Sequence, residues 1–401
     1  MRAGATGPGA LGSAGAAGAA PRLPDGAILL HVGPHKTGTT AIQHAFRLSG
    51  PALAEHGVRY AASRRHRVDA AQAVRSTDPK PGDRHGLQQW RALVDEVRGA
   101  PDARVVISSE WLSEAMPGAI PRIVEDLGVG RVHVVVTLRP LVSILPSQWQ
   151  QYVQGGIHLA YDEWLDAVLL HPDRRVTPSF WQRHRHDQLV GRWADVVGND
   201  RVIAVVADER DPRFVLRTFE ALVGLPEQTL DVHEDRSNRS LTWPEIEVVR
   251  RIQAVLSDLG VDGPLRQGLV LYGAAPAIRE RVPLPGEPRI ETPGWAVDEA
   301  VRIGTEIADG ITASGVHVVG DLARLANAPE HRPAVSELPE DAWPDIAAHA
   351  VRGVLRRSGV LPESGAADGT ARPLTRVSTR RLIGILARRL QRAATRRLAR
   401  A

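Results

Sequence analysis

This chain of 401 residues contains no cysteine, which excludes disulfide bonds, thiolate metal ligands and cysteine nucleophiles. It also lacks any run of eighteen uncharged apolar residues, so we expect no membrane-spanning helix. Lysine is nearly absent, because only Lys36 and Lys80 among the 50 basic residues are lysines.

Acidic residues are missing from residues 372–401, which contain ten arginines. Without that tail the net charge of +4 becomes −6. The high pI therefore belongs largely to the tail and does not indicate that the rest of the chain binds nucleic acid.

The composition fits one large globular domain between two atypical ends. Hydrophobic residues make up 43% of the chain, enough for a sizeable core. Residues 1–25 are rich in Ala and Gly and lack the leucine-rich core of a secretory signal, which predicts a disordered leader. We expect one domain over residues 26–360, helical from about 240 to 360, with a boundary near residue 282 as the alternative. Residues 361–401 form a linker and tail, and the missing cysteine fits a cytoplasmic protein.

Short apolar runs alternate with helical patterns over the first 225 residues. The runs predict strands at 27–33, 57–62, 104–108, 131–138 and 201–206. The helical patterns lie at 39–48, 85–98, 120–127, 141–154, 182–197 and 213–223. This alternation predicts an α/β fold, a parallel sheet with helices on both faces and ligand sites at the carboxyl ends of the strands. Later helices are expected at 242–259, 264–281, 296–313 and 343–358.

The stretch HVGPHKTGTTAIQ, residues 31–43, is similar to a loop that binds nucleoside triphosphates, but its lysine stands elsewhere. In the triphosphate loop G-x-x-x-x-G-K-[ST] the lysine follows the second glycine. Here Lys36 precedes Gly38 by two residues. The loop keeps what a phosphate cradle needs: glycine, N–H groups at a helix N-terminus and three threonine hydroxyls. We expect Lys36 to act on a ligand, because lysine is a compact point charge in a chain that otherwise uses arginine.

The loop PHKTGTT resembles the 5′-phosphosulfate loop, P-x-K-[ST]-G-T-[ST], of sulfotransferases that use 3′-phosphoadenosine 5′-phosphosulfate (PAPS). The family's second element is an arginine at a strand end and a serine eight residues later, and here Arg139 and Ser147 have that arrangement. An arginine fork with a hydroxyl suits a phosphate dianion. The resemblance covers about residues 27–225 and implies a P-loop nucleotide-kinase-like, three-layer fold with a helical C-terminal part. The residues assigned to the loop are Pro34, His35, Lys36, Thr37, Gly38, Thr39 and Thr40.

The resemblance also implies a catalytic base at the end of the strand before the one that leads to Arg139. That place holds Glu110, whereas cytosolic members carry histidine, so the resemblance is to bacterial, carbohydrate-type enzymes. Glu110 is expected to take the proton of the acceptor hydroxyl, with His35 as the alternative base. Lys36 is expected to neutralise charge on the bridging oxygen as the nucleotide leaves. Arg239 is added as a further nucleotide contact, and no metal is expected.

The sequence thus predicts a PAPS-dependent sulfotransferase whose acceptor is a hydroxyl-bearing small molecule or glycan. Two other functions stay open, a phosphotransferase with an unusual loop and a non-catalytic nucleotide-binding module. Nucleic acid is not expected as a partner. In the tail, residues 378–401 place leucines at helical spacing among arginines, a pattern typical of peripheral membrane contact. A solvated tail, or a helix packed on another subunit, is the alternative.

Overall fold

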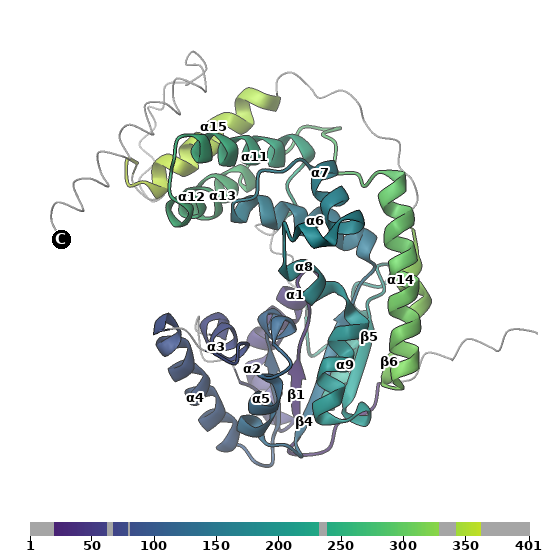
Figure 1. The fold of residues 1–401 in the computed structure, drawn as a ribbon. Helices are drawn as coiled ribbons and strands as arrows, with labels where there is room; N and C mark the ends of the chain where they lie inside the picture. Colours follow the sequence, from purple (N-terminus) through teal and green to yellow (C-terminus); the bar gives the residue numbers. More distant parts are fainter. Residues whose placement is uncertain (1–19, 62–66, 79–80, 232–238, 329–341, 362–401) are drawn as a thin grey trace, which may run out of the picture. The chain divides into compact units, whose positions relative to one another are not determined.

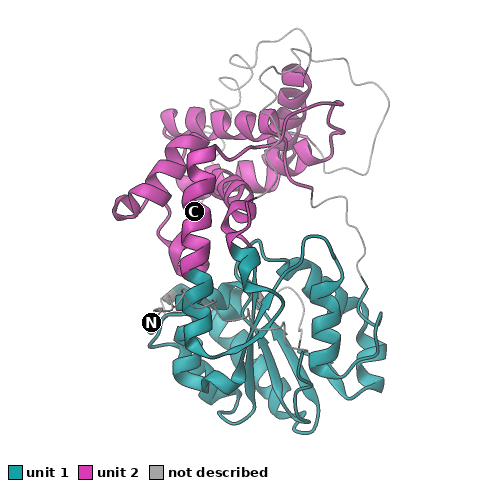
Figure 2. Ribbon diagram, turned by 90° about the vertical axis from the view of Figure 1, so that its right-hand side faces the viewer, with its two compact units in different colours: residues 1–138, 185–231, 307–325 teal, residues 139–184, 232–306, 326–401 magenta. Residues whose placement is uncertain are grey.

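The computed structural model describes residues 20–61, 67–78, 81–231, 239–328 and 342–361. The chain forms two compact units whose segments alternate along the sequence (Figure 2). Unit 1 comprises Met1–Leu138, Arg185–Asp231 and Ile307–Leu325, and unit 2 comprises Arg139–His184, Val232–Glu306 and Ala326–Ala401. Residues 26–360, expected to form one domain, thus contain segments of both units, and the expected domain bounds stay a prediction. The first division falls directly after a strand that ends at Leu138.

Unit 1 is built on a six-stranded, all-parallel sheet (Figure 1). Its strands are β1 (Ile28–His31), β2 (Val58–Tyr60), β3 (Arg104–Ser108), β4 (Val132–Leu138), β5 (Val202–Val206) and β6 (His317–Val319). They lie in the order β2-β3-β1-β4-β5-β6. The first five coincide with predicted strands to within two residues at each end. The sequence did not predict β6, because its three residues lie in a region of helical patterns.

Helices cover both faces of this sheet, which confirms the predicted α/β class. On one face, α1 (Thr39–Leu48) and α10 (Phe214–Val223) contribute Phe46 and Phe219 to a buried apolar cluster with Leu29 of β1. On the other, α9 (His186–Val197) packs against β4 and β5 and also against α5 (Ile120–Leu127). Further helices of unit 1 are α2 (Gly50–Glu55), α3 (Arg67–Val74), α4 (Arg84–Arg98) and the end of α14 (Gly294–Ser314).

The segment 20–25 belongs to the folded part of unit 1, although it was expected to be leader. Leu23 is buried, and its N–H donates to the carbonyl oxygen of Leu222 at 2.8 Å. The carbonyl oxygen of Leu23 accepts a hydrogen bond from Arg104 Nε at 2.9 Å, and Arg104 also pairs with Asp25. An apolar anchor and a buried arginine at the start of β3 therefore hold this segment. Residues 1–19 lie outside the described residues.

Unit 2 is helical, as the patterns beyond residue 240 predict. Its helices are α6 (Leu141–Gly155), α7 (Tyr161–Leu165), α8 (Ser179–His184), α11 (Trp243–Asp258), α12 (Gly263–Leu269), α13 (Ala275–Arg279), α15 (Ala342–Arg357) and the first part of α14. The run expected at 264–281 is α12 and α13 joined by one π-helical turn, η7 (Val270–Ala274). The helix expected at 182–197 is two helices, because the backbone of Arg185 leaves the helical region between α8 and α9.

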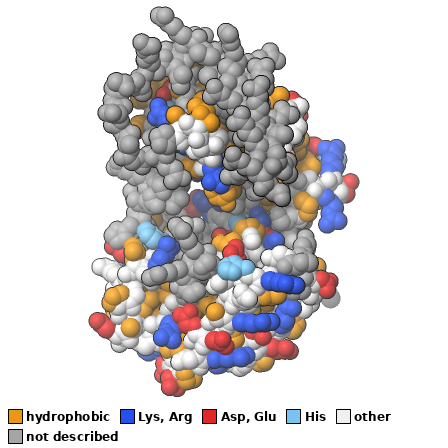
Figure 3. Space-filling model, turned by 90° about the vertical axis from the view of Figure 1, so that its left-hand side faces the viewer, with side chains coloured by type: hydrophobic (Ala, Val, Ile, Leu, Met, Phe, Trp, Pro, Cys, Tyr) orange, Lys and Arg blue, Asp and Glu red, His pale blue; other side chains and the backbone are white. Residues whose placement is uncertain are grey.

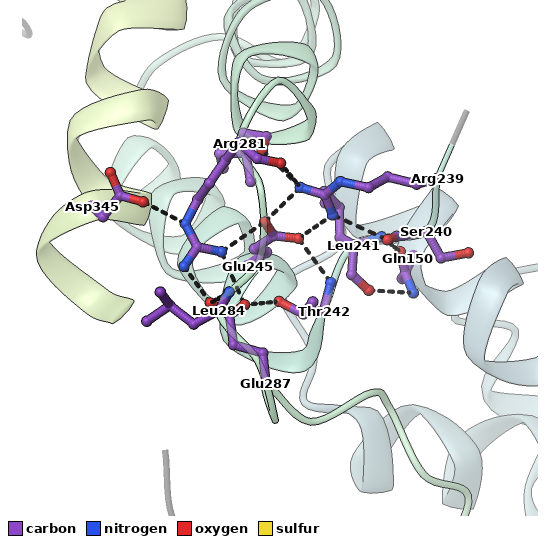
Figure 4. A network of polar contacts seen from close by, with 11 residues as sticks. Gln150, Arg239, Ser240, Leu241, Thr242, Glu245, Arg281, Leu284, Glu287 and Asp345 are labelled. Carbon is purple, nitrogen blue, oxygen red and sulfur yellow. Dashed lines mark hydrogen bonds and ion pairs between the residues drawn. The ribbon is translucent and has the colours of Figure 1, made fainter. Parts of the chain in front are cut away.

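A buried ionic network around Arg281 ties the helices of unit 2 together (Figure 4). Only 2% of the Arg281 side chain is exposed. Its guanidinium pairs with Glu287 in the following turn, with Glu245 of α11 (Nη1–Oε1 3.2 Å) and with Asp345 of α15 (Nε–Oδ2 2.6 Å). The side chains of Glu245 and Glu287 are almost fully buried. One guanidinium therefore holds three elements that are far apart in the sequence.

Glu245 also caps its own helix. Its Oε2 accepts a hydrogen bond from the backbone N–H of Thr242 at 2.9 Å, half of the capping box that the sequence TWPE predicts. The same carboxylate accepts two hydrogen bonds from Arg239, at 2.6 and 2.7 Å. Arg239 Nη2 further donates to the carbonyl oxygens of Ile278 and Arg281, each at 3.0 Å.

On the face shown in Figure 3, acidic and basic side chains are interspersed on unit 1 rather than gathered by sign. None of the described helices is long and apolar enough to cross a membrane. The basic stretch at 378–401 lies outside the described residues, so its membrane contact stays a prediction.

Candidate active site

The loop that follows β1 lies where the strand order of the sheet reverses. β1 has β3 on one side and β4 on the other, and the chain adds β2 and β3 on the first side before it adds β4 to β6 on the second. His31, the last residue of β1, lies opposite Ser108, the last residue of β3, and opposite Val135 of β4. Parallel sheets bind ligands at such a switch point, beyond the carboxyl ends of the strands.

Two residues of the loop adopt left-handed backbone conformations. Gly38 has φ +93°, and Lys36, a non-glycine residue, has φ +69°. That region costs an L-residue with a Cβ atom roughly 1–2 kcal/mol. Lys36 is nevertheless exposed at the apex of the loop. Strained residues of this kind cluster at ligand-binding sites, where the surrounding structure holds them in place.

Helix α1 begins directly after the loop, with Gly38 as its N-cap. The N–H groups of Ala41 and Ile42 are the ones that donate to the carbonyl oxygen of Gly38, at 3.1 and 3.3 Å. The N–H groups before them at the helix N-terminus have no acceptor within the helix. Such N–H groups, together with the positive end of the helix dipole, are an arrangement that can bind an anion.

Two of the three threonines of the loop are buried and the third is exposed. Thr37 Oγ1 donates to the carbonyl oxygen of Pro34 at 2.8 Å, and both Thr37 and Thr39 are buried. Thr39 Oγ1 lies at longer range from the carbonyl oxygens of Gly33 and Pro34, 3.4 and 3.5 Å. Thr40 is exposed. Two of the hydroxyls therefore contact carbonyl oxygens of the loop itself, and the expectation of three hydroxyl donors for a ligand stays a prediction.

Beneath the loop, buried side chains from three strands form a chain of hydrogen bonds. Ser108 Oγ lies 2.8 Å from His31 Nδ1, and His31 Nε2 lies 3.1 Å from Thr137 Oγ1 on β4. Thr137 Oγ1 lies 2.8 Å from Thr37 Oγ1 in the loop. Burial lowers the pKa of His31 to about 3, so its ring is neutral at neutral pH. Sequence reasoning missed His31 and Thr137; the signal was a histidine ending an apolar strand just before the loop.

Gly33 is required by the same imidazole. A Cβ atom at this position would lie 2.4 Å from His31 Nε2 and 2.5 Å from Thr39 Oγ1, far inside van der Waals contact. The backbone of Gly33 does not need a left-handed conformation. Its role is therefore to let the loop lie directly on the histidine ring.

Glu110 lies on the same sheet edge as the loop, within unit 1. It opens the short helix η2 (Glu110–Glu114) that follows β3. Gln43 of α1 donates from Nε2 to Glu110 Oε2 at 3.1 Å and to the carbonyl oxygen of Ser108 at 3.2 Å. The N–H of Ser109 donates to the carbonyl oxygen of His31 at 3.1 Å. Gln43, which sequence reasoning did not single out, thus orients the half-buried carboxylate.

His35 points into a different cluster. Its ring is buried, meets Trp111 edge to face at 5.1 Å between centroids, and has Nε2 at 3.8 Å from Glu114 Oε1. Glu114 in turn pairs with Arg75, whose guanidinium lies over the Trp111 ring at 5.3 Å. Glu110 is more exposed than His35, and this exposure favours Glu110 as the base. The choice between the two stays a prediction.

The second element of the motif lies in unit 2. Arg139 is half-buried and directly follows Leu138, the last residue of β4. Ser147 stands in the second turn of α6, where its Oγ donates to the carbonyl oxygen of Ile144 at 3.0 Å. Ser143 and Gln151, four residues to either side, are also half-buried and share its helix face. The pairing of these residues with the loop stays a prediction.

Arg239, also in unit 2, is bound by protein groups. Both terminal nitrogens of its guanidinium hydrogen-bond to Glu245 or to backbone carbonyl oxygens of the unit. Its role as a nucleotide contact stays a prediction, and nothing proposed below depends on it.

Comparisons with models of protein families, with curated proteins and with solved structures found no match to this chain. Within the described ranges, no group of three or more histidine, aspartate or glutamate side chains is arranged to hold a metal ion. The function of the site is therefore a proposal built on its motif and geometry.

Proposed function

We propose that this protein is a PAPS-dependent sulfotransferase with a P-loop nucleotide-kinase-like sheet, acting on the hydroxyl of a sugar or natural-product alcohol. One observation carries the proposal: the PHKTGTT loop lies at the switch point of a parallel sheet, with Lys36 exposed at its apex and the N-terminus of α1 behind it. Such a seat suits the phosphosulfate of a nucleotide.

In the proposed reaction the acceptor oxygen attacks sulfur in line. An oxygen–sulfur bond forms, and the bond between sulfur and the bridging phosphate oxygen breaks. The bridging oxygen keeps the electron pair as adenosine 3′,5′-bisphosphate leaves. Lys36 and the N–H groups of the loop stabilise the negative charge that develops there. The Thr37 hydroxyl braces the loop against Pro34 and Thr137, and this bracing supports the proposal of a preorganised site.

Glu110 accepts the proton of the acceptor hydroxyl in this mechanism. Its carboxylate is held by Gln43 Nε2 through one oxygen, Oε2, which leaves Oε1 for the proton. We expect Glu110→Gln to lower kcat by about 10² to 10⁴ with nucleotide affinity unchanged, the range for removal of a general base. Retained activity would move the base to His35.

Arg139 and Ser147 are proposed to bind the 3′-phosphate of PAPS. A planar arginine fork and a hydroxyl match the geometry and charge of a phosphate dianion. A nucleotide that lacks the 3′-phosphate should then lose little affinity in Arg139→Ala, while adenosine 3′,5′-bisphosphate should bind about ten to a hundredfold more weakly. Equal losses for the two nucleotides would remove Arg139 from this role.

The decisive test compares nucleotides before any acceptor is known. Isothermal titration of the full chain should show binding of adenosine 3′,5′-bisphosphate and none of ATP with magnesium. ³⁵S-labelled PAPS should then transfer label to a component of an alcohol and glycan panel. Binding of magnesium ATP instead would favour a phosphotransferase. Nucleotide binding without turnover on the panel would favour a non-catalytic module.

Lys36→Ala should lower turnover by about 10² to 10³, the typical cost of removing one preorganised charge. Lys36→Arg should also be poor, because a broad fork replaces a point charge. Arg47→Ala is the matched control, since Arg47 is an exposed cation in the last turn of the same helix α1. An active Lys36→Arg enzyme would count against the role given to this lysine.

A further inference from the structure

The direction of every hydrogen bond in the buried chain under the loop follows from its last member. The carbonyl oxygen of Pro34 can only accept, so Thr37 spends its one hydroxyl proton there. Thr37 must then accept from Thr137, and Thr137, having donated, must accept from His31 Nε2. His31 is therefore protonated on Nε2.

The same reasoning gives the direction of the first hydrogen bond, between Ser108 and His31. A neutral imidazole with its proton on Nε2 has an acceptor at Nδ1, so the hydroxyl of Ser108 donates to it. Each of the four links has one proton, and all of them point towards the loop. Every member is buried, so water does not compete for these groups.

We infer that His31 is a positioning residue: as the neutral tautomer protonated on Nε2, it completes a one-way chain of hydrogen bonds that holds the 33–39 loop in its anion-binding shape. The inference rests on the proposed function only in that the loop binds a nucleotide phosphate. Gly33 provides an independent sign of the same role, because any side chain there would collide with the ring.

The chain makes sharp demands on its members. His31, Thr137 and Thr37 must each accept one hydrogen bond and donate another. Thr137→Ser therefore preserves this series of hydrogen bonds, and Thr137→Val breaks it with little change of volume. His31→Gln places an amide N–H near the position of Nε2 and can still donate to Thr137. His31→Asn reaches only towards Ser108. In each pair of variants, at Thr137 and at His31, one keeps the hydrogen bond and the other loses it while a side chain of similar size remains. A difference within a pair therefore reports on the hydrogen bond.

The first test is spectroscopic and needs no ligand. The full chain labelled with ¹⁵N-histidine should show, in long-range ¹H–¹⁵N spectra, one neutral ring protonated on Nε2 that is absent from His31→Gln. If the signal that His31→Gln removes belongs to a ring protonated on Nδ1, or to a doubly protonated ring, at neutral pH, the inference is overturned.

The second test measures the loop. Amide hydrogen exchange over residues 36–41 should be at least about tenfold faster in Thr137→Val and His31→Asn than in wild type, and near wild type in Thr137→Ser and His31→Gln. Peptides from α9 serve as the control for intact folding. Affinity for adenosine 3′,5′-bisphosphate should follow the same order, with a loss of about tenfold in the broken variants.

The outcomes keep the two proposals apart. Equal loop exchange in Thr137→Val and Thr137→Ser would overturn the positioning role, even if the nucleotide binds. A wild-type protein that binds no bisphosphate would count against the sulfotransferase proposal alone, because the tautomer and the loop exchange decide the positioning role without ligand.

Discussion

Two buried polar networks, one in each unit, are built on opposite principles. Under the loop of unit 1, four neutral side chains each donate one hydrogen bond, and all four bonds run in the same direction. In unit 2, charged groups surround Arg281, and its guanidinium meets three carboxylates. The first network defines the position of a backbone loop, whereas the second joins helices. Each remains stable because its buried groups have partners.

The difference fits what lies beside each network. A carboxylate or a cation beneath the loop would change the electrostatic potential at the place where we propose that a phosphosulfate binds. The four side chains of this network brace the loop without adding a charge of their own. In the ionic network, burial opposes ionisation of Glu287, but hydrogen bonds from Arg281, the N–H of Leu284 and Thr242 outweigh it and lower its pKa. Charge there is compensated within the cluster.

The sharpest way to expose this difference is to remove the central charge of unit 2. Arg281→Met should destabilise the protein by about 3–5 kcal/mol, because it leaves buried Glu287 without its cation and leaves buried Glu245 with Arg239 alone. Urea unfolding gives the free energy, and hydrogen exchange of α11 and α15 peptides localises it. Arg302→Met is the matched control, since exposed Arg302 pairs with Glu299 and Glu306 on one helix. Its cost should stay below about 1 kcal/mol, and equal costs would contradict the comparison.

The hydrogen-bonded network around neutral His31 should make the stability of the protein sensitive to mild acid. The folded protein keeps His31 neutral down to a pKa of about 3, while the unfolded chain binds a proton near the ordinary value of 6.5. Stability is therefore lost as pH falls below 6.5. From pH 7 to pH 5 this residue should account for about 2 kcal/mol. Urea unfolding of wild type and His31→Gln at both pH values measures this contribution. It is the amount by which the free energy of unfolding falls further in wild type than in the variant. Parallel curves would show that His31 is not buried in neutral form.

The ionic network should respond at lower pH than His31 does. Because the folded pKa of Glu287 is below its ordinary value of 4.5, its contribution is present above pH 4.5 and is lost as pH falls through the folded pKa. Glu287→Gln should therefore flatten the decline in stability below pH 4.5, although it lowers stability at pH 7. Unfolding curves at pH 4.5 and 3.5 check this. An undiminished decline in the variant would place the acid sensitivity elsewhere.

The smallest effect concerns backbone strain. Lys36→Gly should raise stability by up to about 1 kcal/mol, because glycine adopts φ +69° without the cost that a Cβ atom brings. Under the proposed function the same change should abolish turnover. Gln228→Gly is the matched control: its φ is +67°, it is exposed, and it lies outside the proposed site. It should gain similar stability and keep activity. A loss of stability in Lys36→Gly would show that the lysine side chain braces the loop.

Sequence patterns predicted the elements that carry the loop and its neighbours. The bounds of α1 and α5 matched the predictions, because helical spacing and turn residues mark both ends. The edge strand β6 escaped, since three residues carry no period of their own and pairing with β5 makes them a strand. The break at Arg185 escaped because apolar spacing continues across it.

The contacts of the site were less accessible from sequence. His31, Ser108 and Thr137 meet only because β1 lies between β3 and β4, an order that local patterns do not encode. The sequence gives no sign that Thr37 braces the loop, since that depends on Thr137 and Pro34 being within reach. The interleaving of the units was likewise hidden, because it depends on which apolar faces meet.

The late position of β6 has a consequence for synthesis of the chain. β5 ends at Val206, and the strand that pairs with its outer edge begins at His317. At about 5–20 residues per second, a ribosome needs on the order of ten seconds to make the segment between them. Throughout that time β5 is a buried-type, apolar strand with an open edge, the kind of template on which other chains assemble. The nascent protein therefore carries an open strand edge while residues 207–316 are made.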